Sequence, residues 1–164
     1  MDRKYLLLAL PFFALMLSAS SVIADNITVS ASVNAGISAV FNFSTVSYGN
    51  LNRGTSDNAA PDQADGVYNV TIGTNKEFKV SGLATQFSNG GHTFNQNNLK
   101  VGMNQTAGGL AVGDSVAVTG DSQDIETDRP ATETDNFFGF WLTIPSNQYA
   151  TAYSSTLTLT YANV

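Results

Sequence analysis

The chain contains no cysteine, a single histidine and a single tryptophan, and only 12% of its 164 residues are charged. The absence of cysteine excludes disulfide staples, thiolate metal sites and thiol catalysis. The fold must therefore be stabilised by buried apolar side chains and strand pairing alone. Beyond residue 24, no apolar segment is long enough to cross a bilayer and no lipidation cysteine is present, so we expect no membrane span in that part of the chain.

Basic residues are also scarce. After residue 24 the chain has twelve acidic and five basic residues, which leaves a net charge of −7. Nucleic-acid binding depends on Lys and Arg neutralising phosphates, so a surface of this charge repels nucleic acid. It also repels anionic lipid headgroups. We therefore expect neither nucleic acid nor a membrane surface among the partners.

Residues 1–24 have the pattern of a cleaved export signal. Arg3 and Lys4 precede an apolar run at residues 5–17, and Val-Ile-Ala at residues 22–24 is the small-residue pattern that signal peptidase cuts after. As a helix this run would reach roughly 20 Å, short of the roughly 30 Å hydrocarbon core of a bilayer. A retained N-terminal anchor is the alternative. Cleavage would release a secreted protein, extracellular or at the cell surface.

The remaining 140 residues, 25–164, have the size of one ordinary domain. Their hydrophobicity alternates with a period of two, as in residues 26–33, and no window has the pattern of an amphipathic helix. Strands that each bury one face predict an all-β fold, an antiparallel β-sandwich of about eight strands with an immunoglobulin-like or pilin-like architecture. The expected strands are residues 26–33, 37–43, 67–72, 76–81, 98–103, 115–119, 137–144 and 153–161.

Signals of catalysis are nearly absent. The single histidine, His92, lies in a glycine turn after Asn89-Gly90, where a solvated loop residue is the simpler interpretation. A catalytic triad needs a histidine held by a carboxylate and within reach of a hydroxyl. The sequence has no Gly-x-Ser-x-Gly elbow, His-Glu-x-x-His pair or phosphate-binding loop. We expect no enzymatic activity and no catalytic residues.

Acidic residues concentrate between residues 114 and 135, which we expect to be a polar loop from residue 120 to residue 136. Several carboxylates together could hold calcium, since hard cations prefer oxygen ligands. The spacing does not match the twelve-residue calcium loop, and a solvated acidic loop is the simpler interpretation. The candidate ligands of a weak calcium site are Asp121, Asp124, Glu126 and Asp128. No other cofactor is expected.

Four Asn-x-Ser/Thr sequons are candidate glycosylation sites: Asn26, Asn42, Asn69 and Asn104. Their number is close to what chance gives in a chain so rich in Asn, Ser and Thr. The count alone is therefore no sign of selection for glycans.

Two parts of the sequence resemble a group of known families. They are Asn-Ile-Thr-Val-Ser-Ala-Ser-Val at residues 26–33 with Phe-Ser-Thr-Val-Ser-Tyr-Gly-Asn-Leu at 43–51, and the final stretch at 144–161. These edges are similar to immunoglobulin-like pilin and fimbrial subunits, including the spore-coat-U type of the chaperone–usher group. They also resemble the TasA-like group, the cysteine-free filament subunits of bacterial biofilms and archaeal pili. The lack of cysteine favours the TasA-like or archaeal kind.

The resemblance implies assembly by strand donation, in which the N-terminal segment of one subunit fills a gap in the next. The candidate donor strand is residues 25–33, and its candidate plugs are Ile27, Val29, Ala31 and Val33. The same segment could equally be the first strand of its own sandwich.

The sequence thus predicts a secreted structural subunit of an extracellular filament, pilus or surface matrix, with copies of itself as its partners. The alternative is a monomeric secreted β-sandwich module for binding or adhesion, with carbohydrate as a candidate ligand. Such a module needs exposed aromatic side chains beside polar groups. Trp141 is one candidate, but its neighbours between Phe137 and Leu142 favour a place in the core.

Overall fold

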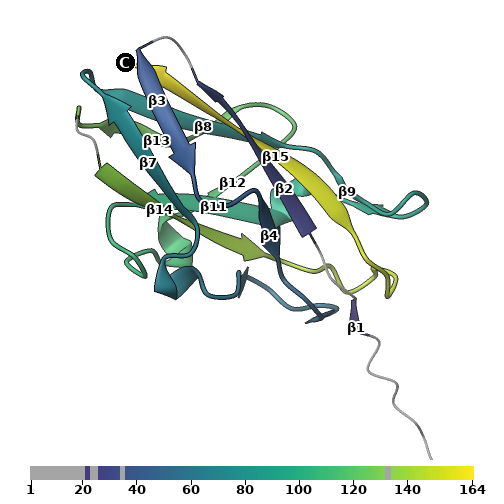
Figure 1. Ribbon diagram of the computed structural model, residues 1–164. Helices are drawn as coiled ribbons and strands as arrows, with labels where there is room; N and C mark the ends of the chain where they lie inside the picture. The colour runs from purple at the N-terminus through teal and green to yellow at the C-terminus, as the bar shows by residue number, and fades with distance from the viewer. Residues whose placement is uncertain (1–20, 23–25, 34–35, 132–133) are drawn as a thin grey trace, which may run out of the picture.

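Two β-sheets pack face to face in the computed structural model, which describes residues 21–22, 26–33, 36–131 and 134–164 (Figure 1). Sheet I contains β2 (Asn26–Val33), β4 (Thr45–Ser47), β8 (Phe78–Ala84), β9 (Phe87–Ser88), β10 (Thr93–Phe94), β13 (Gln123–Arg129) and β15 (Ser154–Asn163). Sheet II contains β3 (Ile37–Phe41), β6 (Asn58–Ala59), β7 (Asn69–Thr74), β11 (Leu99–Asn104), β12 (Val116–Ala117) and β14 (Thr134–Leu142). A separate ribbon pairs β1 (Ser21–Val22) with β5 (Leu51–Asn52). The only helices among the described residues are the 3-10 turns η1 (Gln63–Asp65), η2 (Gln96–Asn98) and η3 (Val112–Asp114).

Strand order confirms the expected sandwich and adds one exception to its antiparallel pairing. In sheet I the hydrogen-bonded order is β13-β8-β15-β2-β4, with the β9–β10 hairpin beside the start of β15. In sheet II the order is β12-β11-β14-β7-β3, and β6 pairs with the end of β14. The strands β2 and β15 run parallel, whereas every other pair in the described part of the chain is antiparallel.

Each of the eight expected strands overlaps a strand of the structure, but the expected number is too low. The described residues form fifteen strands, six of which are only two residues long. Such short strands offer no periodicity to detect, because a period of two needs four or more residues. The expected Asn-Gly turn joins β9 to β10, where the Asn89 Oδ1 accepts a hydrogen bond from the His92 backbone N–H at 3.2 Å.

The expected acidic loop from residue 120 to residue 136 was wrong over most of its length, since it contains β13 and the start of β14. Ile125 is 8% exposed and is the one apolar side chain that β13 buries in the core. The pairing of β13 with β8 shifts register twice, so a strict alternation is lost. Charged side chains and bulges are the means by which proteins protect an edge strand from pairing with other chains.

The core lies between the two sheets and is rich in aromatic side chains. From β15, Leu157, Leu159 and Tyr161 point inward and are fully buried, which confirms the expected face. Phe43 crosses between the sheets and makes edge contacts with Tyr68, Phe138 and Phe140, with ring centroids 5.4–6.1 Å apart. Each such contact contributes about 0.5–1.5 kcal/mol beyond simple burial.

One polar group in the described core, a tyrosine hydroxyl, lacks a hydrogen bond. The Tyr161 hydroxyl is buried and has no hydrogen-bond partner among the described residues. Burial raises the pKa of this phenol far above its ordinary value. By contrast, the equally buried Tyr153 hydroxyl donates to Gln148 Oε1 at 3.2 Å.

These two tyrosines give a matched test of the core. We expect Tyr161→Phe to raise the free energy of unfolding by about 1 kcal/mol, because it removes an unpaired buried hydroxyl. Tyr153→Phe should lower it by about 1 kcal/mol, because it deletes a satisfied one. Urea denaturation measures both. A loss of stability in Tyr161→Phe would contradict the assignment.

The pH dependence follows from the same raised pKa. Above about pH 10 the unfolded chain releases the Tyr161 proton while the folded chain retains it, so stability falls as the pH rises. Tyr161→Phe should lack that part of the alkaline loss.

Candidate functional site

The N-terminal strand β2 lies between the C-terminal strand β15 and the short strand β4 (Figure 1). Its eight residues pair with eight of β15 in parallel register, and its first three pair with β4. The Asn26 N–H donates to the Tyr153 carbonyl at 3.1 Å, and the Val29 N–H donates to the Ser44 carbonyl at 2.9 Å. We call the surface of β15 and β4 that it covers the β2 seat.

The candidate plugs of β2 differ in burial. Ile27 is fully buried and Val29 is 9% exposed, and both belong to the core. Ala31 is on the same face of the strand but is exposed. The side chain of Val33 lies outside the described residues. Ile27 and Val29 therefore make most of the apolar contact that can be described.

The two ends of β2 lie at opposite poles of the sandwich (Figure 1). Its start lies at the tip pole, defined by Asn26, Tyr153 and the β9–β10 hairpin. Its end lies at the hinge pole, where Val33 pairs with Tyr161 and β3 begins at Ile37. Residues 34–36 join β2 in sheet I to β3 in sheet II.

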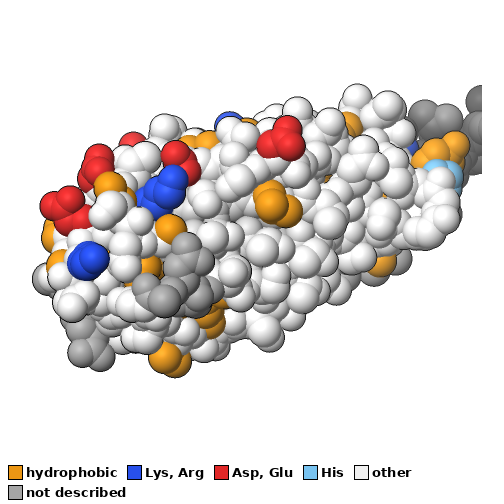
Figure 2. Space-filling model, turned by 90° about the horizontal axis from the view of Figure 1, so that it is seen from above, with side chains coloured by type: hydrophobic (Ala, Val, Ile, Leu, Met, Phe, Trp, Pro, Cys, Tyr) orange, Lys and Arg blue, Asp and Glu red, His pale blue; other side chains and the backbone are white. Residues whose placement is uncertain are grey.

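An aromatic pair is exposed at the tip pole. The rings of His92 and Tyr149 stack with centroids 3.9 Å apart, and Tyr149 is 62% exposed. Figure 2 shows the imidazole beside hydrophobic side chains at one end of the molecule, away from the acidic end. Among the described residues, no carboxylate or hydroxyl forms a hydrogen bond or ion pair with the His92 ring, so the structure assembles no triad around it.

The candidate calcium ligands are not brought together. Asp121 lies in the loop before β13, whereas Asp124, Glu126 and Asp128 are distributed along β13. Glu126 forms an ion pair with Arg129 at 2.9 Å. Within the ranges that the structure describes, no group of three acidic or histidine side chains is close enough to hold a metal ion.

Three of the four sequon asparagines share one row on the outer face of sheet II. Asn69 on β7 and Asn104 on β11 both lie opposite Phe137 of β14, one on each side. Asn42 extends the row, since its Oδ1 accepts from the Asn69 N–H at 2.9 Å. Asn104 binds its own loop by donating to the Gly109 carbonyl at 3.2 Å. The fourth, Asn26, is exposed at the start of β2.

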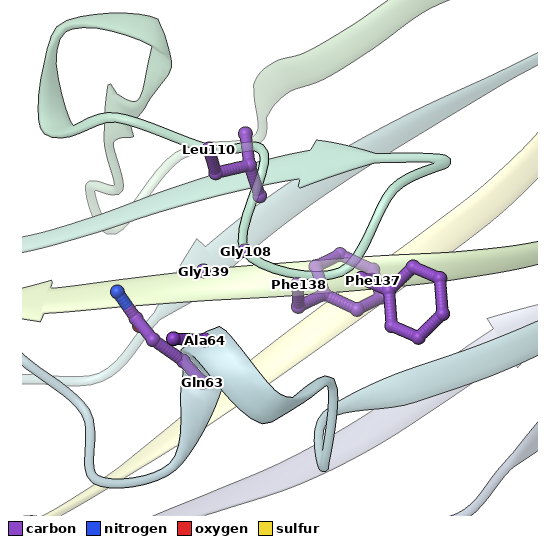
Figure 3. A pocket seen from close by; sticks show the side chains of 7 residues that line it. All are labelled: Gln63, Ala64, Gly108, Leu110, Phe137, Phe138 and Gly139. Atoms are coloured by element: carbon purple, nitrogen blue, oxygen red, sulfur yellow. The ribbon is translucent and has the colours of Figure 1, made fainter.

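A pocket opens on the same face, next to this row (Figure 3). Its empty volume, including the open mouth, is about 300 Å³. Gln63 and Ala64 of η1 stand on one side, and Leu110 stands on the other. The remaining lining residues are Gly108, Phe137, Phe138 and Gly139.

Trp141 is not the exposed platform that the binding-module alternative requires. It is 5% exposed, but it lies outside the core cluster, on the outer face of sheet II with Phe137 and Gly139. A Cβ at Gly139 would lie 2.4 Å from Trp141 Cη2, so the glycine makes room for the indole ring. Phe137 and Phe138 are the aromatic residues that line the pocket. The alternation of Phe137, Gly139 and Trp141 in the sequence was the signal that could have placed Phe137 on the outer face.

The leader prediction falls mostly outside the described residues, which include only two of its members, Ser21 and Val22. These pair with Asn52 and Leu51, a contact that a chain cleaved after residue 24 would lack. In the described part of the chain, no helix has the length and apolar character needed to span a membrane.

Plug substitutions test the unequal burial of β2. We expect Ile27→Ala to lower the free energy of unfolding by about 2–4 kcal/mol, because it leaves a cavity in the core. Ala31→Ser should change it by less than about 0.5 kcal/mol, because that side chain is exposed. Urea denaturation of the two variants provides the comparison, and equal losses would contradict the described seating.

Calcium binding is tested by thermal melting. We expect the Tm to change by less than about 1 °C in millimolar calcium, because the four carboxylates are dispersed and a ligand that binds only the native state would raise it. A calcium-dependent rise in Tm that the Asp124→Asn substitution abolishes would instead support a calcium site at these residues.

Comparison with known proteins does not identify a family for this chain. No protein-family model matches the chain, and no curated protein matches it significantly. Function must therefore be inferred from the residues and geometry of the chain itself.

Proposed function

We propose that this protein is a secreted structural subunit of an extracellular filament, pilus or surface matrix, in which β2 of one subunit occupies the β2 seat of another. The observation that carries the proposal is the position of β2. It is the segment directly after the expected cleavage site, its eight-residue ladder is made with the last strand of the chain, and residues 34–36 alone join it to β3.

Strand exchange would cost little free energy in such an arrangement. A donated β2 would again fill the seat with main-chain hydrogen bonds to β15 and β4 and with apolar side chains facing the core. Without any β2, the seat would expose apolar core and the unpaired edge of β15. An exported chain with few charges and no cysteine would gain a non-covalent link to its neighbours in this way.

The short connection sets the geometry of assembly. From Val33 to Ile37 the chain reaches at most about 14 Å. If β2 entered a neighbour in its present direction, the hinge poles of both subunits would meet, and the second β2 would close a reciprocal dimer. If it entered in the opposite direction, the hinge pole of the donor would meet the tip pole of the acceptor. That contact is heterologous, so it repeats without closing.

A filament therefore requires β2 to be donated antiparallel to β15. The alternation of the strand tolerates reversal, because residues 27, 29, 31 and 33 share a face in either direction. Head-to-tail contact would also cover Tyr149 at the tip pole, which is 62% exposed in the single subunit.

The competing function is a monomeric binding or adhesion module. The pocket beside Phe137 favours it, since binding sites are concave, largely apolar and supplied with a few polar groups. The two functions are compatible, because the pocket lies on the outer face of sheet II and the β2 seat lies in sheet I.

A disulfide lock tests donation directly in this cysteine-free chain. Thr28 and Thr45 are exposed and directly opposite on β2 and β4, at a non-hydrogen-bonded position where the Cα atoms approach closely enough for a disulfide. We expect the oxidised double variant Thr28→Cys/Thr45→Cys to stay monomeric in light scattering and electron microscopy. Reduction should restore polymerisation to the wild-type rate, because β2 is free to leave its seat again.

The matched control is Thr71→Cys/Asp135→Cys, a non-hydrogen-bonded pair between β7 and β14 of sheet II. It should polymerise in both redox states, since neither strand is exchanged. Polymerisation of the oxidised β2–β4 variant at the wild-type rate would rule out donation of β2. A wild-type protein that forms no polymer would rule out the filament itself.

A further inference from the structure

The pocket on sheet II occupies a gap in the strand ladder. On the side of β14 that pairs with β7 and β6, neither strand covers the stretch between Phe138 and Trp141. The Gln63 side chain fills part of this gap, because its Oε1 accepts a hydrogen bond from the Phe140 N–H at 2.8 Å. The Gln63 amide is thus held over β14 by a main-chain partner, which fixes its orientation.

Two close backbone approaches hold the pocket walls in place. A Cβ at Gly108 would lie 3.0 Å from the Ala64 carbonyl oxygen, so the loop after β11 touches η1. A Cβ at Gly66 would lie 2.9 Å from the Phe137 ring, so the chain after η1 touches the aromatic wall. Both glycines have positive φ, at 68° and 74°. The site is therefore preformed, as ligand pockets usually are.

The pocket offers one polar side chain, that of Gln63, among apolar side chains and glycines. Because the Gln63 Oε1 is occupied by Phe140, its Nε2 presents the free hydrogens, and no acceptor for them is found among the described residues. Figure 3 shows this nitrogen over β14, at the end of the Gln63 side chain that points away from the Phe137 and Phe138 rings. Leu110 and the Phe137 ring supply apolar contact. An amide donor beside apolar side chains suits a small ligand group that has a carbonyl oxygen next to a methyl.

The surface next to the pocket suits a neutral sugar. Phe137 both lines the pocket and forms part of the row with Asn42, Asn69 and Asn104. Amides donate to and accept from hydroxyl groups, and the Asn42 and Asn69 amides can do so while the Asn104 amide is engaged by its own loop. An aromatic ring packs against the apolar face of a pyranose. Asp62 directly before η1 and Asp65 at its end are exposed, so an anionic ligand would be repelled.

We propose that this pocket binds the acetamido group of an N-acetylated amino sugar, with the sugar ring lying along Phe137 and the asparagine row. The acetamido carbonyl accepts from the Gln63 Nε2, and its methyl packs against Leu110. This inference does not depend on filament formation, because the site is complete within one subunit.

Two trisaccharides that differ at this group provide the test. We expect N,N′,N″-triacetylchitotriose, titrated into the isotopically labelled secreted protein, to shift the NMR amide signals of residues 63–66, 108–110 and 137–139 with saturation in the millimolar range. Cellotriose, which carries a hydroxyl in place of each acetamido group, should leave these signals unshifted up to about 10 mM, where a ligand of millimolar Kd would bind. Equal shifts from both sugars, or none from either, would overturn the proposal.

A substitution that keeps the fold but removes the donor sharpens the test. Gln63→Glu retains an oxygen to accept from the Phe140 N–H, so the Tm should hold, while chitotriose affinity should fall at least about ten-fold. Gln86→Glu adds the same charge at an exposed position on the chain and should bind as wild type does. Leu110→Ala provides a second variant and should weaken binding through the lost methyl contact. Wild-type affinity in both pocket variants would show that the ligand does not occupy this site.

Discussion

The parallel ladder between β2 and β15 is the interaction on which the rest of the structure depends. It joins the first described long strand to the last strand of the chain, and it places Ile27 and Val29 in the core beside Leu157 and Leu159. No disulfide reinforces it, because the chain has no cysteine. Closure of the sandwich therefore rests on reversible main-chain bonds and on apolar contact. Because these bonds are reversible, the proposed donation of β2 to a second subunit would exchange one set of non-covalent contacts for another of the same kind.

Sequence periodicity identified the long strands because each buries alternate side chains against the opposite sheet. The clearest case is β15, where Leu157, Leu159 and Tyr161 were expected on one face and are buried there. The same reasoning failed for β13, because an edge strand rich in charged side chains and with two register shifts contributes only Ile125 to the core. Strand existence could be predicted, whereas strand order depends on contacts between strands that are distant in the sequence. The parallel direction of β2 depends on pairs of residues more than a hundred positions apart.

The candidate site was predictable only in part, for a related reason. Local alternation alone could place Ile27 and Val29 on the buried face of their strand, whereas the role of plug came from the resemblance to donor strands. The row of Asn42, Asn69 and Asn104 beside Phe137 is created by the register of four strands, which no local pattern encodes. Gln63 gave no signal at all, since its role comes from a gap in the ladder that exists only after β7 and β6 have paired with β14.

The two proposed activities occupy different sheets, and this separation has a consequence for binding strength. A pocket with one fixed amide donor and a small apolar lining supports only weak affinity for a single sugar, because the ligand makes few contacts. A polymer joined through the β2 seat would leave the outer face of sheet II uncovered by that joint and repeat the pocket along its length. Binding to a surface that carries many copies of the sugar then becomes multivalent, and avidity can exceed single-site affinity by about 10²–10⁴ without any new contact. Weak sites can support adhesion when polymerisation presents many copies of them together.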